Sequence, residues 1–240
     1  MSVKIVSADS IVSTAEGKLT VKEQVVARCR ATQTTPNTSL LTDPNEPLAL
    51  DIEFQEYRHK DAIKWGHRMG RIAIVNTRGQ TVYDTYVNYE RDEDVSMKMP
   101  PACFGVTWKD LNIANGAKPS WEVERHLTDI MNGRTIVGHG MRLDIAAITP
   151  TLWDGVNTVD TQSIYGQVAL SRLSDEILNL PIQHGFHHPT EDAVATMLLY
   201  LRLYPYKGRT TFKEPEKPLN LQDETEYPPL GASMGKKKKR

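Results

Sequence analysis

The chain has 240 residues, of which 39% are hydrophobic and 25% are charged, and this composition excludes a wholly disordered or fibrous protein. No run of about 18 apolar residues occurs, so we expect no membrane-spanning helix. The formal net charge is −1, but the last five residues, Lys236 to Arg240, are all basic. This basic run is either a solubilising tail or a nuclear import signal and nucleic-acid tether. The second interpretation predicts a nuclear or nucleolar location, with the cytoplasm as the alternative.

Prolines and polar residues divide the sequence into three regions. Residues 1–46 form an N-terminal extension of uncertain order, closed by Pro44 and followed by Pro47. Residues 47–205 carry the regular hydrophobic patterns and are expected to form one compact domain. Residues 206–240 form a proline-rich, lysine-terminated tail whose composition cannot build a core. The sequence does not predict an oligomeric state.

The compact region begins with strand patterns and then alternates between strands and helices. This order predicts a mixed sheet with helices packed on it. Ser120 is expected to cap the first helix and Thr190 the last one. The predicted strands cover residues 48–54, 71–76, 81–87, 135–138 and 157–160. The predicted helices cover about residues 121–131, 141–148 and a last segment from 193 to 201.

Two acidic residues interrupt the first predicted strand. Asp51 and Glu53 flank Ile52 in a segment that is otherwise apolar. Side chains two apart on a strand point to the same face, so the two carboxylates converge. A buried pair of like charges is unfavourable unless a cation lies between them, and a divalent metal ion is the usual solution. The alternative is an edge strand with two exposed acids.

Two later segments each place an acid near a histidine. His139 follows a predicted strand, and the helix that begins there presents Asp144. Further on, His187 and His188 precede the last helix, whose first turn carries Asp192. Taken alone, each segment is explained by an ordinary acid at a helix N-terminus, where the macrodipole favours negative charge.

Together, the three acidic segments resemble the DEDDh 3′→5′ exonucleases. Asp-x-Glu lies on the first strand, and His-x4-Asp enters both the middle helix and the last helix. The segments Val137–Asp144, Val159–Gln162 and Glu191–Tyr200 are similar to the RNA exonuclease 4-type branch, which includes the interferon-stimulated exonuclease. The resemblance covers about residues 48–204. It implies an α/β, ribonuclease H-like fold: a mixed five-stranded sheet with helices on both faces.

The same resemblance implies a metal-dependent nuclease site. His187 would be the general base, and two Mg²⁺ ions, with Mn²⁺ as a substitute, would be the cofactors. Such ions prefer hard oxygen ligands and, at about 3.5–4 Å apart, can clamp an in-line displacement. His188 is the competing histidine, because it has the spacing at which the sister DEDDy families place a tyrosine. The metal-binding acids implied by the family are Asp51, Glu53, Asp144 and Asp192.

Four further residues are candidate substrate contacts. Phe54 stands where the family usually carries Met, and it either stacks on the 3′-terminal base or belongs to the core. Trp65 lies in a basic stretch between the first two strands and is either a stacking platform beside phosphate contacts or part of a solvated loop. Arg142 is a weaker phosphate-contact candidate. His139 either contacts the substrate or packs behind the site.

The expected activity is hydrolysis of single-stranded RNA from its 3′ end, with release of nucleoside 5′-monophosphates, in RNA processing such as that of ribosomal RNA, or in turnover. RNA is favoured over single-stranded DNA by the branch resemblance alone. One alternative is a DNA-trimming or repair exonuclease. The other is an inactive nucleic-acid-binding module on the same fold, which the presence of all four acids and the histidine disfavours. No membrane partner is expected.

Overall fold

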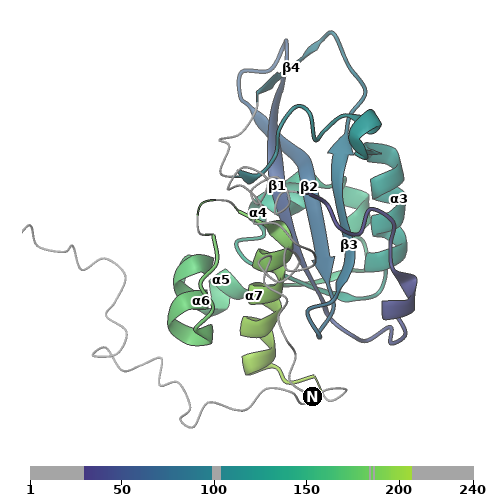
Figure 1. Ribbon diagram of the computed structural model, residues 1–240. Helices are drawn as coiled ribbons and strands as arrows, with labels where there is room; N and C mark the ends of the chain where they lie inside the picture. Colours follow the sequence, from purple (N-terminus) through teal and green to yellow (C-terminus); the bar gives the residue numbers. More distant parts are fainter. Residues whose placement is uncertain (1–29, 99–103, 184, 186, 207–240) are drawn as a thin grey trace, which may run out of the picture.

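The structure is a computed structural model that describes residues 30–98, 104–183, 185 and 187–206. The described residues form a mixed sheet with helices packed against it (Figure 1). The strands are β1 (Leu48–His59), β2 (Gly66–Val75), β3 (Thr81–Asn88), β4 (Val95–Lys98), β5 (Lys118–Pro119), β6 (Thr135–Gly138) and β7 (Asn157–Asp160). The α-helices are α3 (Ser120–Met131), α4 (Arg142–Ala147), α5 (Thr161–Ile164), α6 (Leu170–Leu178) and α7 (Pro189–Leu203).

The sheet has the order β5-β3-β2-β1-β6-β7, and β4 pairs with β1 outside this path. β1 is antiparallel to β2, and β2 to β3, whereas β6 and β7 continue in parallel on the other side of β1. The predicted α/β architecture with a mixed sheet is therefore confirmed. The described chain has seven strands, not the five predicted. The additional strands, β4 and β5, have four and two residues, and neither contains a run of apolar residues.

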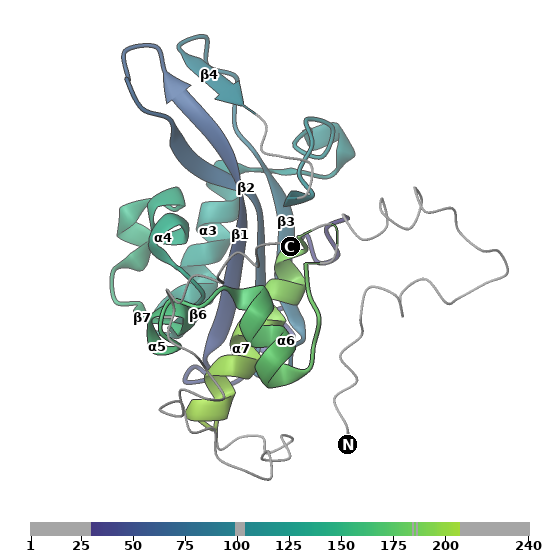
Figure 2. The ribbon, with the colours of Figure 1, turned by 90° about the vertical axis from the view of Figure 1, so that its left-hand side faces the viewer.

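Alternation along β1 divides its side chains between two cores. Leu50 and Ile52 are buried in the core that includes residues of α3. Ala49 is buried in a second core with residues of α7. Figure 2 shows α3 and α4 on one side of the sheet and α6 and α7 on the other. Because side chains two apart share a face, Asp51 and Glu53 lie on the face that α7 covers.

β1 and β2 extend past their predicted ends as a hairpin that we call the β1–β2 arm, residues 55–70. Figure 2 shows the arm projecting beyond the helices, with β4 alongside it. The predicted strand ends are wrong because the arm lacks the apolar alternation of the core strands. A register shift at Glu53 and Phe54 marks its base. A Cβ on Gly70 would lie 2.9 Å from the carbonyl oxygen of Glu53, so this close pairing requires glycine.

α3 begins one residue, and α7 two residues, before the position that its predicted cap implies. α3 begins at Ser120, after Pro119, and α7 begins at Pro189, after His188. The predicted caps Ser120 and Thr190 are wrong, because both residues lie within the helices. The residues that precede the helices, Pro119 and His188, make no side-chain capping bond. Proline is well suited to the first helical position, since the N–H it lacks would have no partner within the helix. It therefore starts α7 in place of a capping hydroxyl.

Residues 30–46 lie against the domain rather than apart from it. Gln33 forms an antiparallel bridge with Asp84 of β3, and the backbone N–H of Asn37 donates to the carbonyl of Val82 at 2.8 Å. Residues of β3 thus accept partners from a segment well before the predicted domain boundary.

Much of the predicted extension and tail, including the basic run Lys236 to Arg240, lies outside the described residues. The boundaries at residues 46 and 205 remain predictions. Within the described chain, no helix is both long enough and apolar enough to cross a bilayer.

Candidate active site

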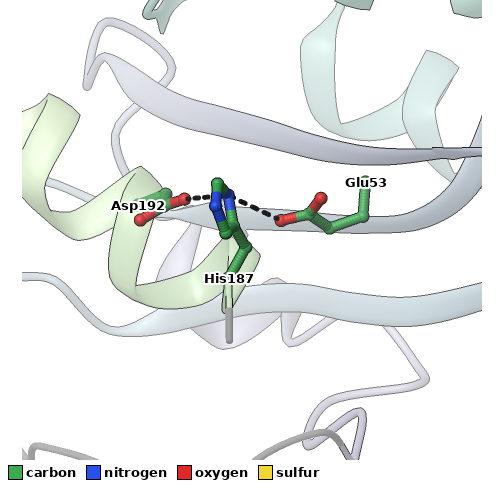
Figure 3. Close-up of side chains that lie close together, drawn as sticks. All are labelled: Glu53, His187 and Asp192. Atoms are coloured by element: carbon green, nitrogen blue, oxygen red, sulfur yellow. Dashed lines mark ion pairs between the residues drawn. The ribbon is translucent and has the colours of Figure 1, made fainter. Parts of the chain in front are cut away.

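Three of the predicted site residues meet where β1 passes the beginning of α7. Glu53, His187 and Asp192 each offer one ligand atom, and these atoms lie within 4.8 Å of one another. The Nδ1 atom of His187 is 4.0 Å from Oε1 of Glu53 and 3.9 Å from Oδ2 of Asp192. Figure 3 shows the imidazole between the two carboxylates. The acids are buried and the ring is partly exposed, so the cluster can be reached from solvent through the histidine.

Asp51 lies next to this cluster on the same face of β1. Burial raises its pKa well above the ordinary value of an aspartate. The neighbouring charges that raise it further are those of Asp192, Glu53 and Asp144. The charges of all three other predicted acids therefore act on Asp51. Asp51 is not in the tight group around His187.

Asp144 is presented by the short helix α4, which begins after a tight turn at the end of β6. Gly140 in this turn has φ +73°, a conformation that favours glycine. Asp160 at the end of β7 accepts hydrogen bonds from the N–H groups of Gly140 and Met141 at 2.8 and 3.2 Å. These bonds fix the start of α4 and hence the place of Asp144. Burial raises the pKa of Asp144 to about 7, and the charge of Asp160 adds to the increase.

The other two acids also have raised pKa values. Burial, followed by the charge of Asp192, raises the pKa of Glu53 to about 8, against the opposing effect of Arg71. Burial raises the pKa of Asp192 to about 7, while a 2.8 Å hydrogen bond from Gln183 Nε2 to its Oδ2 lowers it. The second oxygen of Asp192, Oδ1, is buried and has no hydrogen-bond partner within the described chain. Four crowded carboxylates with an open acceptor favour a bound cation.

The structure separates the two competing histidines. The ring of His187 lies between the acids and also packs against Phe104, with ring centroids 5.0 Å apart. Burial lowers the pKa of His187, so the neutral ring predominates near pH 7. His188 instead places Nε2 3.4 Å from Nη2 of Arg71. The geometry therefore favours His187 over His188 as the histidine that acts at the acids.

The four candidate substrate contacts have different surroundings. Phe54 is partly buried against the α3-side core, with its ring edge-on to His67. Trp65 is 37% exposed in the β1–β2 arm, with the guanidinium of Arg58 5.1 Å from its ring centre. Arg142 is exposed at the first position of α4.

His139 is held by the protein through both ring nitrogens, 2.9 Å from Thr161 Oγ1 and 2.9 Å from the carbonyl of Val168. It therefore has no free ring nitrogen for a substrate, and these bonds favour the expectation that it packs behind the site.

Sequence reasoning missed several residues that shape the site. Gln183 binds Asp192, Phe104 packs on His187, and a fully buried ion pair joins Arg71 to Asp84. Gln183 and Phe104 lie in irregular segments and carry no pattern. Asp84 did carry a signal, because it interrupts the apolar strand β3 just as Asp51 interrupts β1.

The mixed sheet with helices on both faces is the ribonuclease H-like fold, and solved structures share it. The catalytic unit of Neurospora crassa Pan2, with its protease and nuclease domain, matches at a TM-score of 0.57 and 22% identity, covering 75% of this chain and 30% of that chain. The Saccharomyces cerevisiae Pan2 pseudoubiquitin hydrolase-RNA exonuclease module, in complex with A7 RNA, matches at a TM-score of 0.55 and 20% identity, covering 81% and 35%. No model of a known protein family matches the chain.

Curated relatives specify the branch. RNA exonuclease 4 of Aspergillus fumigatus is 32% identical over 143 residues, covering 56% of this chain and 44% of the relative. RNA exonuclease 4 of Debaryomyces hansenii is 30% identical over 186 residues, covering 73% and 65%. RNA exonuclease 4 of S. cerevisiae is 31% identical over 148 residues, covering 55% and 46%. The chain thus spans from under half to about two thirds of the length of these relatives. The resemblance to the DEDDh exonucleases of the RNA exonuclease 4 type is confirmed.

We expect the crowded acids to destabilise the metal-free protein increasingly as the pH rises. The pKa values of Glu53, Asp144 and Asp192 are about 8, 7 and 7 in the folded chain and near 4 when unfolded. Between about pH 4 and 8 the folded state therefore binds more protons, and the stability present below the unfolded pKa is lost as the pH rises through the folded pKa. Urea unfolding in EDTA should show that Asp51→Asn is more stable than wild type, by about 1–2 kcal/mol at pH 8 and by less at pH 5.

The matched control is Asp129→Asn on α3, where the carboxylate is exposed. The free energy of unfolding of Asp129→Asn should stay close to that of wild type at both pH values. If the difference in the free energy of unfolding between Asp51→Asn and wild type became smaller as the pH rises, the assignment of raised pKa values would be contradicted.

Proposed function

We propose that this chain is a 3′→5′ exonuclease that hydrolyses single-stranded RNA and releases nucleoside 5′-monophosphates. The observation that carries the proposal is the meeting of Glu53, His187 and Asp192, with Asp51 beside them on β1. A histidine between two carboxylates, on a fold shared with solved nucleases, suits proton abstraction next to a cation-bound phosphate. The similarity to RNA exonuclease 4 supports RNA as the substrate.

The donor set fits divalent metal ions. The four acids supply hard oxygen atoms, their charges repel one another, and a buried oxygen of Asp192 lacks a partner within the described chain. Two Mg²⁺ ions, or Mn²⁺ in their place, would activate the attacking water and offset the negative charge that develops on the leaving 3′-oxygen. The residues proposed to hold the ions are Asp51, Glu53, Asp144 and Asp192.

The role proposed for His187 follows from its position. Its ring lies against the acids and is partly exposed, so it can take a proton from the attacking water and pass it to solvent. The water oxygen bonds to the phosphorus of the terminal phosphodiester, and the bond from phosphorus to the 3′-oxygen breaks. The terminal nucleotide leaves with its 5′-phosphate, and the 3′-oxygen of the shortened strand takes a proton from solvent to become a 3′-hydroxyl.

The function is tested with RNA labelled at its 5′ end. Purified full-length chain with Mg²⁺ should shorten the strand progressively from the 3′ end and release mononucleotides, and EDTA should stop the reaction. Matched DNA is digested in parallel, and faster hydrolysis of the DNA would favour a DNA-trimming enzyme. Binding of the oligonucleotide without release of mononucleotides, in both Mg²⁺ and Mn²⁺, would favour an inactive binding module.

The β1–β2 arm is proposed to grip the RNA strand upstream of the cleaved end. It presents exposed Trp65 with Arg58 beside its ring, and exposed Lys64 next to the tryptophan. Arg58 lies five residues beyond Glu53 on β1, or about 17 Å along the strand. A short RNA cannot reach both the acids and this part of the arm, whereas a longer strand can.

Trp65→Ala should therefore raise the KM for an RNA of about twelve nucleotides roughly tenfold, because a base stacked on an aromatic ring contributes about 1–3 kcal/mol. The KM for a dinucleotide should not change. Trp121→Ala is a matched control, since Trp121 on α3 is exposed and has the Arg125 guanidinium 5.9 Å from its ring centre. Equal effects of Trp65→Ala on long and short RNA would rule out the grip.

We also propose a nuclear location, supported by the basic run Lys236 to Arg240. A fluorescent fusion of the full chain should accumulate in nuclei, and replacement of the five basic residues by alanine should abolish the accumulation. If the alanine variant is distributed in the cell as the wild-type fusion is, the basic run is a solubilising tail and not an import signal.

A further inference from the structure

A buried ion pair lies beside the proposed active site. Arg71 of β2 donates from Nε to Oδ1 of Asp84 at 2.8 Å and from Nη2 to Oδ2 at 2.9 Å. The two side chains are only 1% and 0% exposed. A two-point contact of this kind holds both side chains in one orientation. Arg71 is also the register partner of Glu53 in the β1–β2 pairing, so the pair adjoins the acid cluster.

The pair is joined by a segment that precedes the predicted domain. The backbone N–H and the hydroxyl of Thr32 donate to Oδ2 of Asp84 at 2.9 and 3.0 Å. The carbonyl of Arg30 accepts from Nη2 of Arg71 at 3.0 Å. Residues 30–32 thus contribute three hydrogen bonds to the pair.

The pair also reaches the segment that carries the proposed general base. Nη2 of Arg71 is 3.4 Å from Nε2 of His188. A guanidinium can only donate, and the two hydrogens of Nη2 also serve Asp84 and the carbonyl of Arg30. Nε2 of His188 therefore accepts a hydrogen of Nη2 that it shares in a three-centre contact. The hydroxyl of Thr190, in the first turn of α7, lies 3.5 Å from Oδ2 of Asp84. One ion pair therefore contacts both the residue after His187 and the turn that carries Asp192.

We propose that Arg71 and Asp84, acting through His188, position His187 against the acid cluster, and that residues 30–32 complete this device. The inference rests on the proposed exonuclease function and assigns no catalytic role to His188 itself. The ring of His188 points to Arg71, and the backbone between His188 and His187 transmits that constraint to the catalytic ring. Loss of the contact leaves the acids in place but frees His187 to leave its position.

Misplacing a catalytic group by about 1 Å can cost about 100-fold in rate. The expected defect is thus in kcat, with the KM for RNA nearly unchanged, since the strand-binding arm is untouched. The acidic limb of the pH profile should remain, because His187 still accepts the proton when its ring is in place. A general loss of folding would not produce this combination.

The experiment compares His188→Leu with His188→Gln. Leucine removes the acceptor that faces Arg71, whereas the glutamine amide oxygen can replace it. His188→Leu should lower kcat about 10- to 100-fold, and His188→Gln should restore most of the rate. Thr32→Val, which removes one hydroxyl bond to Asp84, should lower kcat less, and Thr35→Val in the same segment should not change it.

Crystal structures of the two His188 variants supply a readout that does not depend on turnover. The distance from His187 Nδ1 to Glu53 Oε1, which is 4.0 Å in the wild type, should lengthen in His188→Leu and stay short in His188→Gln. An unmoved His187 in both variants, or equal kcat for both in an active enzyme, would overturn the inference. An inactive wild type would instead overturn the proposed function, while the two structures would still decide the positioning role.

Discussion

Replacing His187 with alanine is expected to slow the release of mononucleotides from RNA by about 10²–10⁴-fold, the range for loss of a general base. The Nδ1 atom of His187 lies 4.0 and 3.9 Å from carboxylate oxygens of Glu53 and Asp192. From this position the ring can accept the proton of a water bound beside the acids. Single-turnover rates with labelled RNA, measured at saturating Mg²⁺ across the pH range, provide the test. The wild-type rate should fall at low pH as the His187 ring becomes protonated, and this fall should be absent in the variant.

His126→Gln on α3 is the control for this substitution, because His126 contacts Tyr83 on the far side of the sheet. It should keep both the wild-type rate and the wild-type pH profile. Near-normal turnover by His187→Ala would remove this residue from the proton transfer. Loss of the acidic limb in a His188 variant instead would transfer the role to His188.

Asp51→Asn should reduce turnover by at least about 10²–10³-fold, the cost of losing one electrostatic stabiliser in a preorganised site. Burial raises the pKa of Asp51, and the charges of Asp192, Glu53 and Asp144 raise it further, so its carboxylate lies within reach of all three other acids. Asparagine keeps the shape of the side chain and removes its charge. The concentration of Mg²⁺ that gives half-maximal activity should therefore rise as well.

The same variant should also be more stable than wild type in EDTA, and this gain separates a lost metal site from a damaged fold. Calorimetric titration with Mn²⁺ should show weaker binding to Asp51→Asn than to Asp129→Asn, which retains all four proposed ligands. Undiminished Mn²⁺ binding and turnover in Asp51→Asn would show that this carboxylate holds no cation.

Local patterns predicted the central elements of the fold. Five strands were visible from apolar runs, and Asp51 and Glu53 were assigned to one face because β-strand geometry requires it. Their meeting with Asp192 is a tertiary contact that spacing along the chain cannot establish, and it was predicted only through the family resemblance. The helix α6 was missed although its local pattern is readable, because Leu170, Leu173 and Ile177 share one helical face. Leu170 and Leu173 pack with Leu199 of α7.

The polar arm and the ion pair were hidden for different reasons. In residues 55–70, pairing by backbone hydrogen bonds replaces the apolar periodicity that reveals a core strand. Arg71 looked like one member of a basic stretch, and its burial depends on Asp84, which lies in the next strand. Asp84 interrupts an apolar strand as Asp51 does, and this pattern indicates a buried partner at position 84 as well.

The contacts of residues 30–32 with β3 affect how the minimal folding unit should be defined. The predicted boundary at residue 47 follows the prolines Pro44 and Pro47, whereas the carboxylate of Asp84 receives two hydrogen bonds from Thr32. A truncated chain that starts at residue 47 would exchange those bonds for water at the inner edge of the sheet. Such a fragment would contain every acid of the proposed site and still lack part of the folded unit, so the extent of the sequence patterns and the extent of the folded unit differ in this protein.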